Sequence, residues 1–292
     1  MPTLLIHNAD CIATLDDSRR ELRQGYIFIR DGKIESLGSA DTLPPDLLHS
    51  ADEVIDAAGH LLIPGLVNTH HHMYQSLTRA IPQVQNAELF GWLRGLYPIW
   101  AGLTPEMVQV STQVAMAELL LSGCTTSSDH LYIYPNGVTL DDSIHAALQI
   151  GMRFTASRGS MSVGASQGGL PPDSVVERED AILRDSQRLI ERYHDASHGA
   201  MTQVALAPCS PFSVTKQLMV ESAQLAEKLN VRLHTHFAEN SEDDAFSLAT
   251  FGCRPTEYLE DVGWCTDRAW VAHCVMPNHE EVQRLGKAKV GV

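Results

Sequence analysis

An apolar run changes abruptly into three histidines in the stretch Pro64-Gly65-Leu66-Val67-Asn68-Thr69-His70-His71-His72-Met73-Tyr74-Gln75. If the run is a buried strand, successive side chains point to opposite faces, so His70 and His72 share one face and His71 lies on the other. Two imidazoles on one face predict half of a site for a metal such as zinc, which needs three protein ligands and an open position for catalysis. A tag-like histidine cluster is the alternative, but a tag lies at a terminus, not directly behind an apolar run.

Composition and charge narrow the class of protein. With 292 residues, 44% of them hydrophobic, the chain can bury the core of a large α/β domain, alone or with a small companion. Its 36 acidic and 21 basic residues give a formal net charge of -15, which opposes binding to a nucleic-acid backbone. The six cysteines include no C-x-x-C pair, and no apolar stretch approaches the ~20 residues of a membrane helix. We expect a cytoplasmic protein with neither a nucleic-acid partner nor a membrane partner.

Residues 1–58 are rich in β-type segments. Two such runs, residues 26–30 and residues 33–38, flank the dipeptide Asp31-Gly32. Asp-Gly between β-type runs is a strong hairpin signal. We therefore predict a small β-sandwich-like domain, of which these residues are the N-terminal part.

Residues 59–292 alternate short apolar runs with longer helical stretches, which is typical of βα units around a parallel sheet. After the histidine stretch, we predict strands at residues 124–128, 152–158, 203–208, 231–237 and 269–275, with the start of a seventh at 289–292. Helices are predicted after the cap Thr104 and at residues 140–149, 174–193, 216–229 and 279–285. We interpret the aromatic-rich residues 88–100 as a loop.

This alternation predicts an α/β fold, a (β/α)₈ TIM-like barrel that is C-terminally incomplete after about six and a half units and stops before strand eight. An open parallel sheet, as in flavodoxin-like folds, is the competing architecture. The barrel is favoured because polar residues lie at the C-terminal ends of strands one, three, five and six, where a barrel gathers its active site.

The fifth predicted strand repeats the histidine pattern. His234 and His236 share one face, and Glu239 follows His236 by three residues. A histidine and a nearby carboxylate can provide a metal ligand and a general acid or base for a metal-bound water. His234 lies deeper in the strand, so we interpret it as a supporting or core residue. His273, on the sixth predicted strand, belongs to the same strand-end layer at an equivalent depth, which favours a place in the same site over a satisfied core residue.

Three segments together resemble the amidohydrolase superfamily, in the aminohydrolase branch that includes cytosine, guanine and adenosine-type deaminases and triazine hydrolases. They are residues 64–72, Leu233-His234-Thr235-His236-Phe237-Ala238-Glu239 and Val271-Ala272-His273-Cys274-Val275. Within this branch the sequence is most similar to 8-oxoguanine deaminases, with isoxanthopterin deaminases nearby, through residues 70–79, 127–130 and 207–212. The resemblance extends over essentially the whole chain.

The resemblance implies a role for each matching residue. The metal ligands are matched by His70, His72 and His236. Glu239 matches the residue that transfers protons, and His273 matches the residue that contacts the attacking water or the substrate.

Three further residues match positions that bind the substrate in related deaminases: Gln75, Arg158 and, more weakly, Cys209. A salt bridge at the end of the strand is the alternative for Arg158.

The resemblance also implies the reaction. One divalent metal ion is expected, with zinc as the first choice and iron as the alternative, because imidazole ligands suit both. The small-molecule substrate is purine-like or pterin-like, and the reaction converts 8-oxoguanine to urate and ammonia. Deamination of isoxanthopterin or guanine and hydrolysis of a triazine are the alternatives. A non-catalytic metal-binding or interaction protein is the alternative from another class, and relatives suggest a homo-oligomer.

Members of the superfamily have a further metal ligand, an aspartate at the end of strand eight. No residue of this sequence matches that position, because the predicted strands stop at the seventh. We therefore expect residues 1–292 to be a fragment of a longer enzyme, with little or no deaminase activity by itself.

Overall fold

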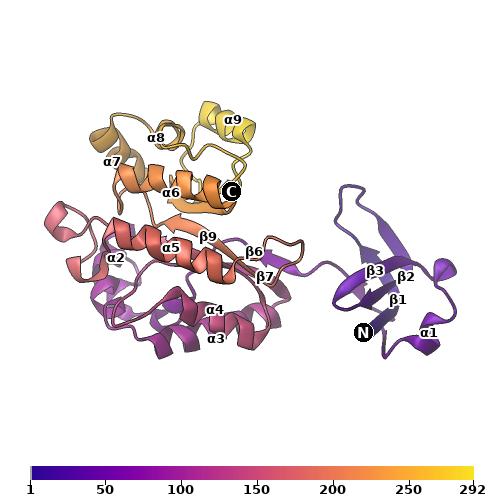
Figure 1. Cartoon of the computed structure of the whole chain (residues 1–292). Helices are drawn as coiled ribbons and strands as arrows, with labels where there is room; N and C mark the ends of the chain where they lie inside the picture. The colour runs from indigo at the N-terminus through magenta and orange to yellow at the C-terminus, as the bar shows by residue number, and fades with distance from the viewer. Residues whose placement is uncertain (1) are drawn as a thin grey trace. The chain divides into compact units, whose positions relative to one another are not determined.

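The computed structural model describes residues 2–292, which divide into two compact units, Met1–Leu66 and Val67–Val292. Each unit has its own sheet and its own buried core (Figure 1).

The first unit is a five-stranded sheet, in agreement with the predicted small N-terminal β-structure. Asp31 and Gly32 connect two antiparallel strands, and both have positive φ (51° and 71°), as a type I′ hairpin turn requires. Leu5, Tyr26 and Phe28 are buried together, with the short helix α1 packed against them. In sheet order the strands are β3 (Lys33–Ser39), β2 (Glu21–Arg30), β1 (Thr3–Ala13) and β4 (Glu53–Asp56), with β5 (Leu61–Leu62) also beside β1, and the helices are η1 (Ala40–Thr42) and α1 (Leu47–Ser50).

The pairing of β5 with β1 is parallel and joins Cys11 to Leu61. This pairing places residues 61–62 in the first unit. The boundary between the units therefore lies later in the chain than the predicted boundary between residues 58 and 59. The described residues of this unit form one sheet, not two facing sheets.

The second unit is built around a six-stranded parallel sheet whose strand order follows the chain. Such a sheet, with a helix in each connection after β7, fits part of a TIM barrel. Its strands are β6 (Leu66–Asn68), β7 (Cys124–Leu131), β8 (Arg153–Ser160), β9 (Thr202–Pro208), β10 (Arg232–Phe237) and β11 (Ala269–His273).

Helices cover the outer face of this sheet, and α3 to α6 succeed one another along it in Figure 1. The α-helices are α2 (Leu89–Trp100), α3 (Pro105–Leu121), α4 (Leu140–Ile150), α5 (Glu179–Tyr193), α6 (Lys216–Leu229), α7 (Ser241–Phe251), α8 (Pro255–Asp261) and α9 (His279–Ala288). The 3₁₀ helices are η2 (Met73–Thr78), η3 (Pro82–Val84), η4 (Ala165–Gln167) and η5 (Asp173–Val175). Among the described residues, no helix combines the length and the apolar character that crossing a membrane requires.

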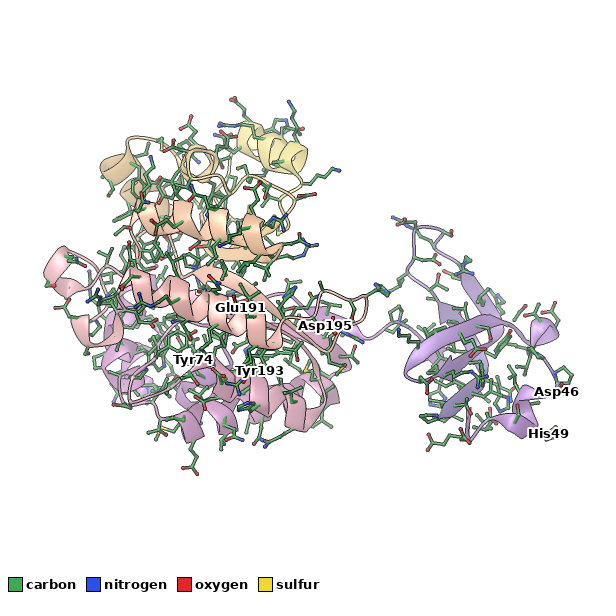
Figure 2. All side chains as sticks on the ribbon, in the orientation of Figure 1. Asp46, His49, Tyr74, Glu191, Tyr193 and Asp195 are labelled. Atoms are coloured by element: carbon green, nitrogen blue, oxygen red, sulfur yellow. The ribbon has the colours of Figure 1, made fainter. Side chains whose placement is uncertain are left out.

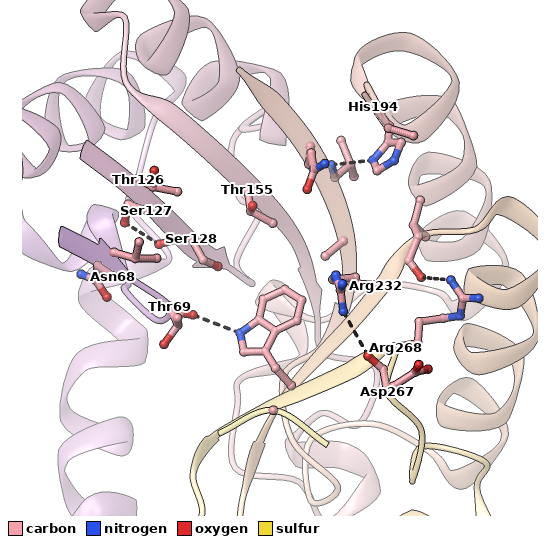
Figure 3. A pocket seen from close by; sticks show the side chains of 18 of the residues that line it. Asn68, Thr69, Thr126, Ser127, Ser128, Thr155, His194, Arg232, Asp267 and Arg268 are labelled. Atoms are coloured by element: carbon pink, nitrogen blue, oxygen red, sulfur yellow. Dashed lines mark hydrogen bonds between the residues drawn. The ribbon is translucent and has the colours of Figure 1, made fainter. Parts of the chain in front are cut away.

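Side-chain alternation separates the two faces of the sheet. On β8, Phe154 and Ala156 point outward into the apolar core beneath the helices. Thr155 points inward, where it lines a cavity of about 580 Å³ with Thr126 and Ser128 of β7 (Figure 3). This cavity lies against the N-terminal halves of the strands, so the polar residues at the opposite strand ends occupy a separate region.

The predicted strands at residues 124–128, 152–158, 203–208, 231–237 and 269–275 are all confirmed within a few residues. The seventh is reduced to a single bridge between Trp270 and Gly291. The first barrel strand, β6, is also shorter than predicted, because it ends at Asn68. The three histidines therefore lie in the irregular segment after the strand.

The interpretation of residues 88–100 as a loop was wrong, because they contain α2. Leu93, Leu96, Tyr97 and Trp100 are buried on one face of this helix, with the spacing of an amphipathic helix. Pro98 lies inside this helix, and because proline usually breaks a helix, the sequence pattern did not indicate one here. We also did not predict α7 and α8, which lie between β10 and β11.

A network of ion pairs joins α4 to α5. Asp141, in the first turn of α4, accepts hydrogen bonds from Arg188, Arg192 and Tyr193 at 2.6–3.2 Å; Tyr193 is at the end of α5 (Figure 2). Burial raises the pKa of Asp141, but the hydrogen bonds from Arg188 and Tyr193 outweigh burial and hold it at about 2, below the usual 3.8. Because the folded-state pKa is lowered, the carboxylate stabilises the fold above pH 4 and loses this effect as pH falls through about 2.

We predict that Asp141→Asn lowers the free energy of unfolding by about 1–2 kcal/mol at pH 7, a value discounted for solvent screening. The difference between variant and wild type should narrow as pH falls from 4 toward 3. Urea unfolding over this range measures it, with Glu191→Gln, an exposed carboxylate on α5 (Figure 2), as the control. A difference that is constant with pH would contradict the assignment.

Candidate metal centre

Histidines from four strands converge at the carboxyl edge of the six-stranded sheet. The ring centroids of His70 and His72 are 4.6 Å apart, and those of His72 and His236 are 5.0 Å apart. The remaining members of the cluster come from β7, β10 and β11: His130, His234 and His273.

The three predicted metal ligands meet in the structure. One ligand atom from each of His70, His72 and His236 lies within 4.8 Å of the others. His72 Nδ1 is 2.7 Å from the His130 carbonyl oxygen, and His236 Nδ1 is 2.6 Å from the Cys209 carbonyl oxygen. Because a carbonyl only accepts, these contacts assign the proton of each ring to Nδ1. The Nε2 lone pairs of His72 and His236 then face each other at 3.0 Å.

The Nδ1 proton of His70 is assigned in the same way, from its contact with the imidazole of His234. His234 Nδ1 is 2.9 Å from the Trp270 carbonyl oxygen, so it carries the proton and His234 Nε2 is an acceptor. His70 Nδ1, at 2.8 Å from that Nε2, is the donor. This leaves the Nε2 lone pair of His70 free to join the other two.

Burial keeps these rings neutral, which is the form that binds a metal. It lowers the pKa of His72 to about 3 and that of His234 to about 4, and it also lowers the pKa values of His70 and His236 well below the usual 6.5. Three neutral Nε2 lone pairs directed at one point repel one another unless a cation lies between them. Their chemistry therefore fits a divalent metal ion that prefers nitrogen ligands.

A second convergent group uses His70 with two residues that we did not predict as ligands, His130 and His234. His130 Nε2 donates to the Ala207 carbonyl at 2.9 Å, and His130 Nδ1 is buried without a protein partner. The signal for His130 was present in the sequence, since alternation along β7 places it on the same inward face as Ser128.

Residues of β7 hold the histidine segment in place. Asp129 Oδ1 accepts the Met73 N–H at 2.7 Å, and the His130 N–H donates to the His71 carbonyl at 2.7 Å. Burial raises the pKa of Asp129 to about 7. His71 belongs to neither group of converging ligand atoms among the described residues, as its position on the opposite face predicts.

Glu239 and His273 lie next to each other beside the ligands. Glu239 Oε2 is 3.5 Å from His273 Nε2, and the rings of His273 and His236 stack with centroids 5.4 Å apart. Positive φ at Ala238 (46°) and at His273 (72°) turns the chain at both strand ends. Burial raises the pKa of Glu239, so this carboxyl holds a proton more readily than an exposed one.

Asp243 fixes the segment that carries Glu239. Its Oδ2 accepts the Glu239 N–H at 2.8 Å, and the Asn240 side chain caps the same helix, α7, by accepting the N–H groups of Glu242 and Asp243. Burial raises the pKa of Asp243 to about 6.

Gln75 lies against the aromatic side of the cluster. Its Nε2 is 3.3 Å from the Tyr74 hydroxyl and 3.4 Å from the Tyr132 hydroxyl. The Tyr132 ring is 5.3 Å from the His72 ring. Tyr132 therefore contacts both Gln75 and the ring of a proposed metal ligand.

Cys209 also lies within the cluster, but its carbonyl makes the closest contact, the hydrogen bond to His236. Its Sγ is 3.8 Å from His236 Nδ1, and burial raises the pKa of the thiol to about 12. The thiol is therefore neutral at physiological pH.

Arg158 is not brought to the cluster. It shares the outward face of β8 with Phe154 and Ala156, and only 2% of it is exposed. Its guanidinium forms hydrogen bonds at 2.8–3.0 Å to Glu177 and to Asp185 of α5. The structure places this side chain in the salt bridge that was the alternative to substrate binding, so the substrate-binding prediction for Arg158 is not supported by its position.

The parallel sheet and the histidines at its carboxyl edge define an α/β protein of the barrel type with a candidate metal site. A family model described as the amidohydrolase family matches residues 61–292, and the chain belongs to that family.

Curated relatives and solved structures agree with this assignment. The chain is 49% identical over 270 residues to an 8-oxoguanine deaminase of Pseudomonas aeruginosa, covering 92% of this chain and 60% of the relative. It is 35% identical to hydroxydechloroatrazine ethylaminohydrolase of Pseudomonas sp. (strain ADP), covering 100% of this chain and 62% of that protein. Atrazine chlorohydrolase TrzN from Arthrobacter aurescens TC1, solved in complex with zinc, superposes with a TM-score of 0.92 at 34% identity and covers 98% of this chain and 64% of its own. The chain thus spans about three fifths of the length of the curated relatives it matches.

We predict that Arg158→Met lowers the free energy of unfolding by about 3 kcal/mol, because it leaves Glu177 and Asp185 without their cation. Metal binding by the folded variant should equal that of the wild type. Urea unfolding and metal titration measure the two effects, with Arg178→Met, which removes an ion pair of an 85% exposed side chain, as the control. A stable Arg158→Met variant would contradict the structural role.

Proposed function

We propose that this chain is, or is part of, a metal-dependent hydrolytic deaminase of a purine-like heterocycle, with 8-oxoguanine as substrate and urate and ammonia as products. The convergence of three neutral Nε2 lone pairs beside a half-buried carboxyl is the observation that supports it. The 49% identity to an 8-oxoguanine deaminase favours this substrate. Isoxanthopterin is the second candidate, since the chain is 32% identical to an isoxanthopterin deaminase.

The proposed metal ligands are His70, His72 and His236, and zinc is the proposed ion because a similar structure contains it. When bound, zinc would lower the pKa of water from 15.7 to about 7 and so provide hydroxide at neutral pH. The carbonyls of His130 and Cys209 keep the Nε2 atoms of His72 and His236 directed at the ion.

Glu239 is the proposed proton carrier. Its raised pKa suits a group that takes up a proton and then donates it to the ring nitrogen next to the amino-bearing carbon. His273, at 3.5 Å from Glu239, would donate a hydrogen bond to the oxygen added at that carbon. A second proton transfer to the amino group would release ammonia.

Gln75 is the proposed contact to the ring of the substrate. Its amide can donate to a ring carbonyl and accept from a ring N–H, which are the groups that an oxidised purine presents. The amide of Gln75 donates hydrogen bonds to the Tyr74 and Tyr132 hydroxyls, which fix its position.

We predict that an enzyme containing this chain, purified with zinc, releases ammonia from 8-oxoguanine faster than from guanine, isoxanthopterin or an aminotriazine, whereas residues 1–292 alone show little or no turnover. Glu239→Gln should lower kcat by about 10²–10⁴-fold while zinc binding is retained, because only the proton carrier is lost. Glu242→Gln, an exposed neighbour, is the matched control. Stoichiometric zinc without turnover of any of the four compounds would favour a non-catalytic metal-binding protein instead.

The ligand assignment has its own test. We predict that His72→Asn weakens zinc binding by more than the about 10–100-fold that loss of an outer-shell hydrogen bond causes. His71→Asn should bind zinc like the wild type, because His71 belongs to neither group of converging ligand atoms. Competition with a chromophoric chelator measures both affinities, and equal effects of the two substitutions would argue against the assignment.

A further inference from the structure

Of the three proposed ligands, His70 alone donates its Nδ1–H to a group that can itself be a donor or an acceptor. The other two donate to carbonyl oxygens, which have only one role. His70 donates to His234 Nε2, so its tautomer is correct only while His234 is protonated at Nδ1. The orientation and tautomer of His234 therefore control whether His70 offers Nε2 to a metal.

Trp270 contacts His234 in two ways. Its carbonyl oxygen accepts the His234 Nδ1–H at 2.9 Å, and its indole stacks on the imidazole with ring centroids 4.4 Å apart and an interplanar angle of 14°. The two residues are direct partners in the register of β10 and β11, which brings the rings together on the inward face.

The indole also reaches the segment that carries His70. Trp270 Nε1–H donates to the carbonyl oxygen of Thr69 at 3.0 Å, as the dashed line from Thr69 in Figure 3 shows. That carbonyl belongs to the peptide unit immediately before His70, 201 residues from Trp270 in the sequence. One side chain thus links the two ends of the His70–His234 hydrogen bond.

We propose that Trp270 is a positioning residue for His70: it holds the His234 ring plane by stacking and the His70 backbone through Thr69, and so keeps the Nε2 lone pair of His70 directed at the metal. This inference rests on the proposed metal site. It assigns Trp270 a role through other residues, not contact with the metal or the substrate.

Two substitutions separate the contacts. Trp270→Phe removes the indole N–H and keeps an aromatic ring, whereas Trp270→Ala removes the stacking as well. Trp264→Phe is the matched control, because Trp264 is a fully buried tryptophan whose Nε1–H donates to the Met219 carbonyl at 2.9 Å, away from the histidines.

We expect zinc affinity, measured by chelator competition on the full chain, to fall about 10-fold in Trp270→Phe and toward 100-fold in Trp270→Ala. Trp264→Phe should leave zinc affinity unchanged and lower only the urea midpoint. Long-range ¹H–¹⁵N spectra of the imidazoles should show both His70 and His234 protonated at Nδ1 in the wild type, and mixed tautomers in Trp270→Ala.

Wild-type affinity and unmixed tautomers in both Trp270 variants would overturn the inference. A wild-type chain that binds no zinc would overturn the metal site, and the tautomers in the metal-free chain would still test the role of Trp270. The two failures are therefore distinguishable.

Discussion

The candidate metal site depends on three Nδ1–H groups, two of which donate to backbone carbonyls and one to His234 Nε2. They assign the protons of three imidazoles to one side of each ring and leave three Nε2 lone pairs directed at a common point. Burial keeps the rings uncharged at neutral pH, so protonation does not relieve the repulsion between the lone pairs. A divalent cation that prefers nitrogen ligands would relieve it, which is why we propose a metal site here.

The acceptors of these hydrogen bonds are supplied by neighbouring strands. The carbonyls come from His130 at the end of β7, from Cys209 just after β9 and, through His234, from Trp270 on β11. A parallel sheet brings its carboxyl ends to one edge, so residues as far apart in the sequence as His70 and His273 join one cluster. Positive φ at Ala238 and His273 then turns Glu239 and His273 toward it, and such strained backbone is typical of functional sites.

Two groups of arginine–carboxylate ion pairs in the second unit stabilise the fold and do not belong to the histidine cluster. Arg158 lies between β8 and α5 with two carboxylates, and Arg188 and Arg192 join α5 to Asp141 on α4. Both groups stabilise the helical layer on the outer face of the sheet. The inner face and the strand ends carry the histidines, Glu239 and Gln75, so the residues that can act on a ligand are separated from those that hold the helices.

Much of the site could be predicted from the sequence because its signals are local. The alternation His70, His71, His72 and the spacing of His234, His236 and Glu239 each depend only on the geometry of an extended chain. Pattern alone also located most of the strands, since turn residues and apolar periodicity mark them directly. The tertiary structure decided what depends on contacts between distant segments. It placed Arg158 on the outward face, formed α2 around Pro98 by burying four apolar side chains, and made His234 and Trp270 part of the support for His70. The tautomer of a histidine depends on which atom accepts its Nδ1–H. Here those acceptors belong to other segments of the chain. The Nε2 lone pairs therefore become available to a metal only when the sheet has formed.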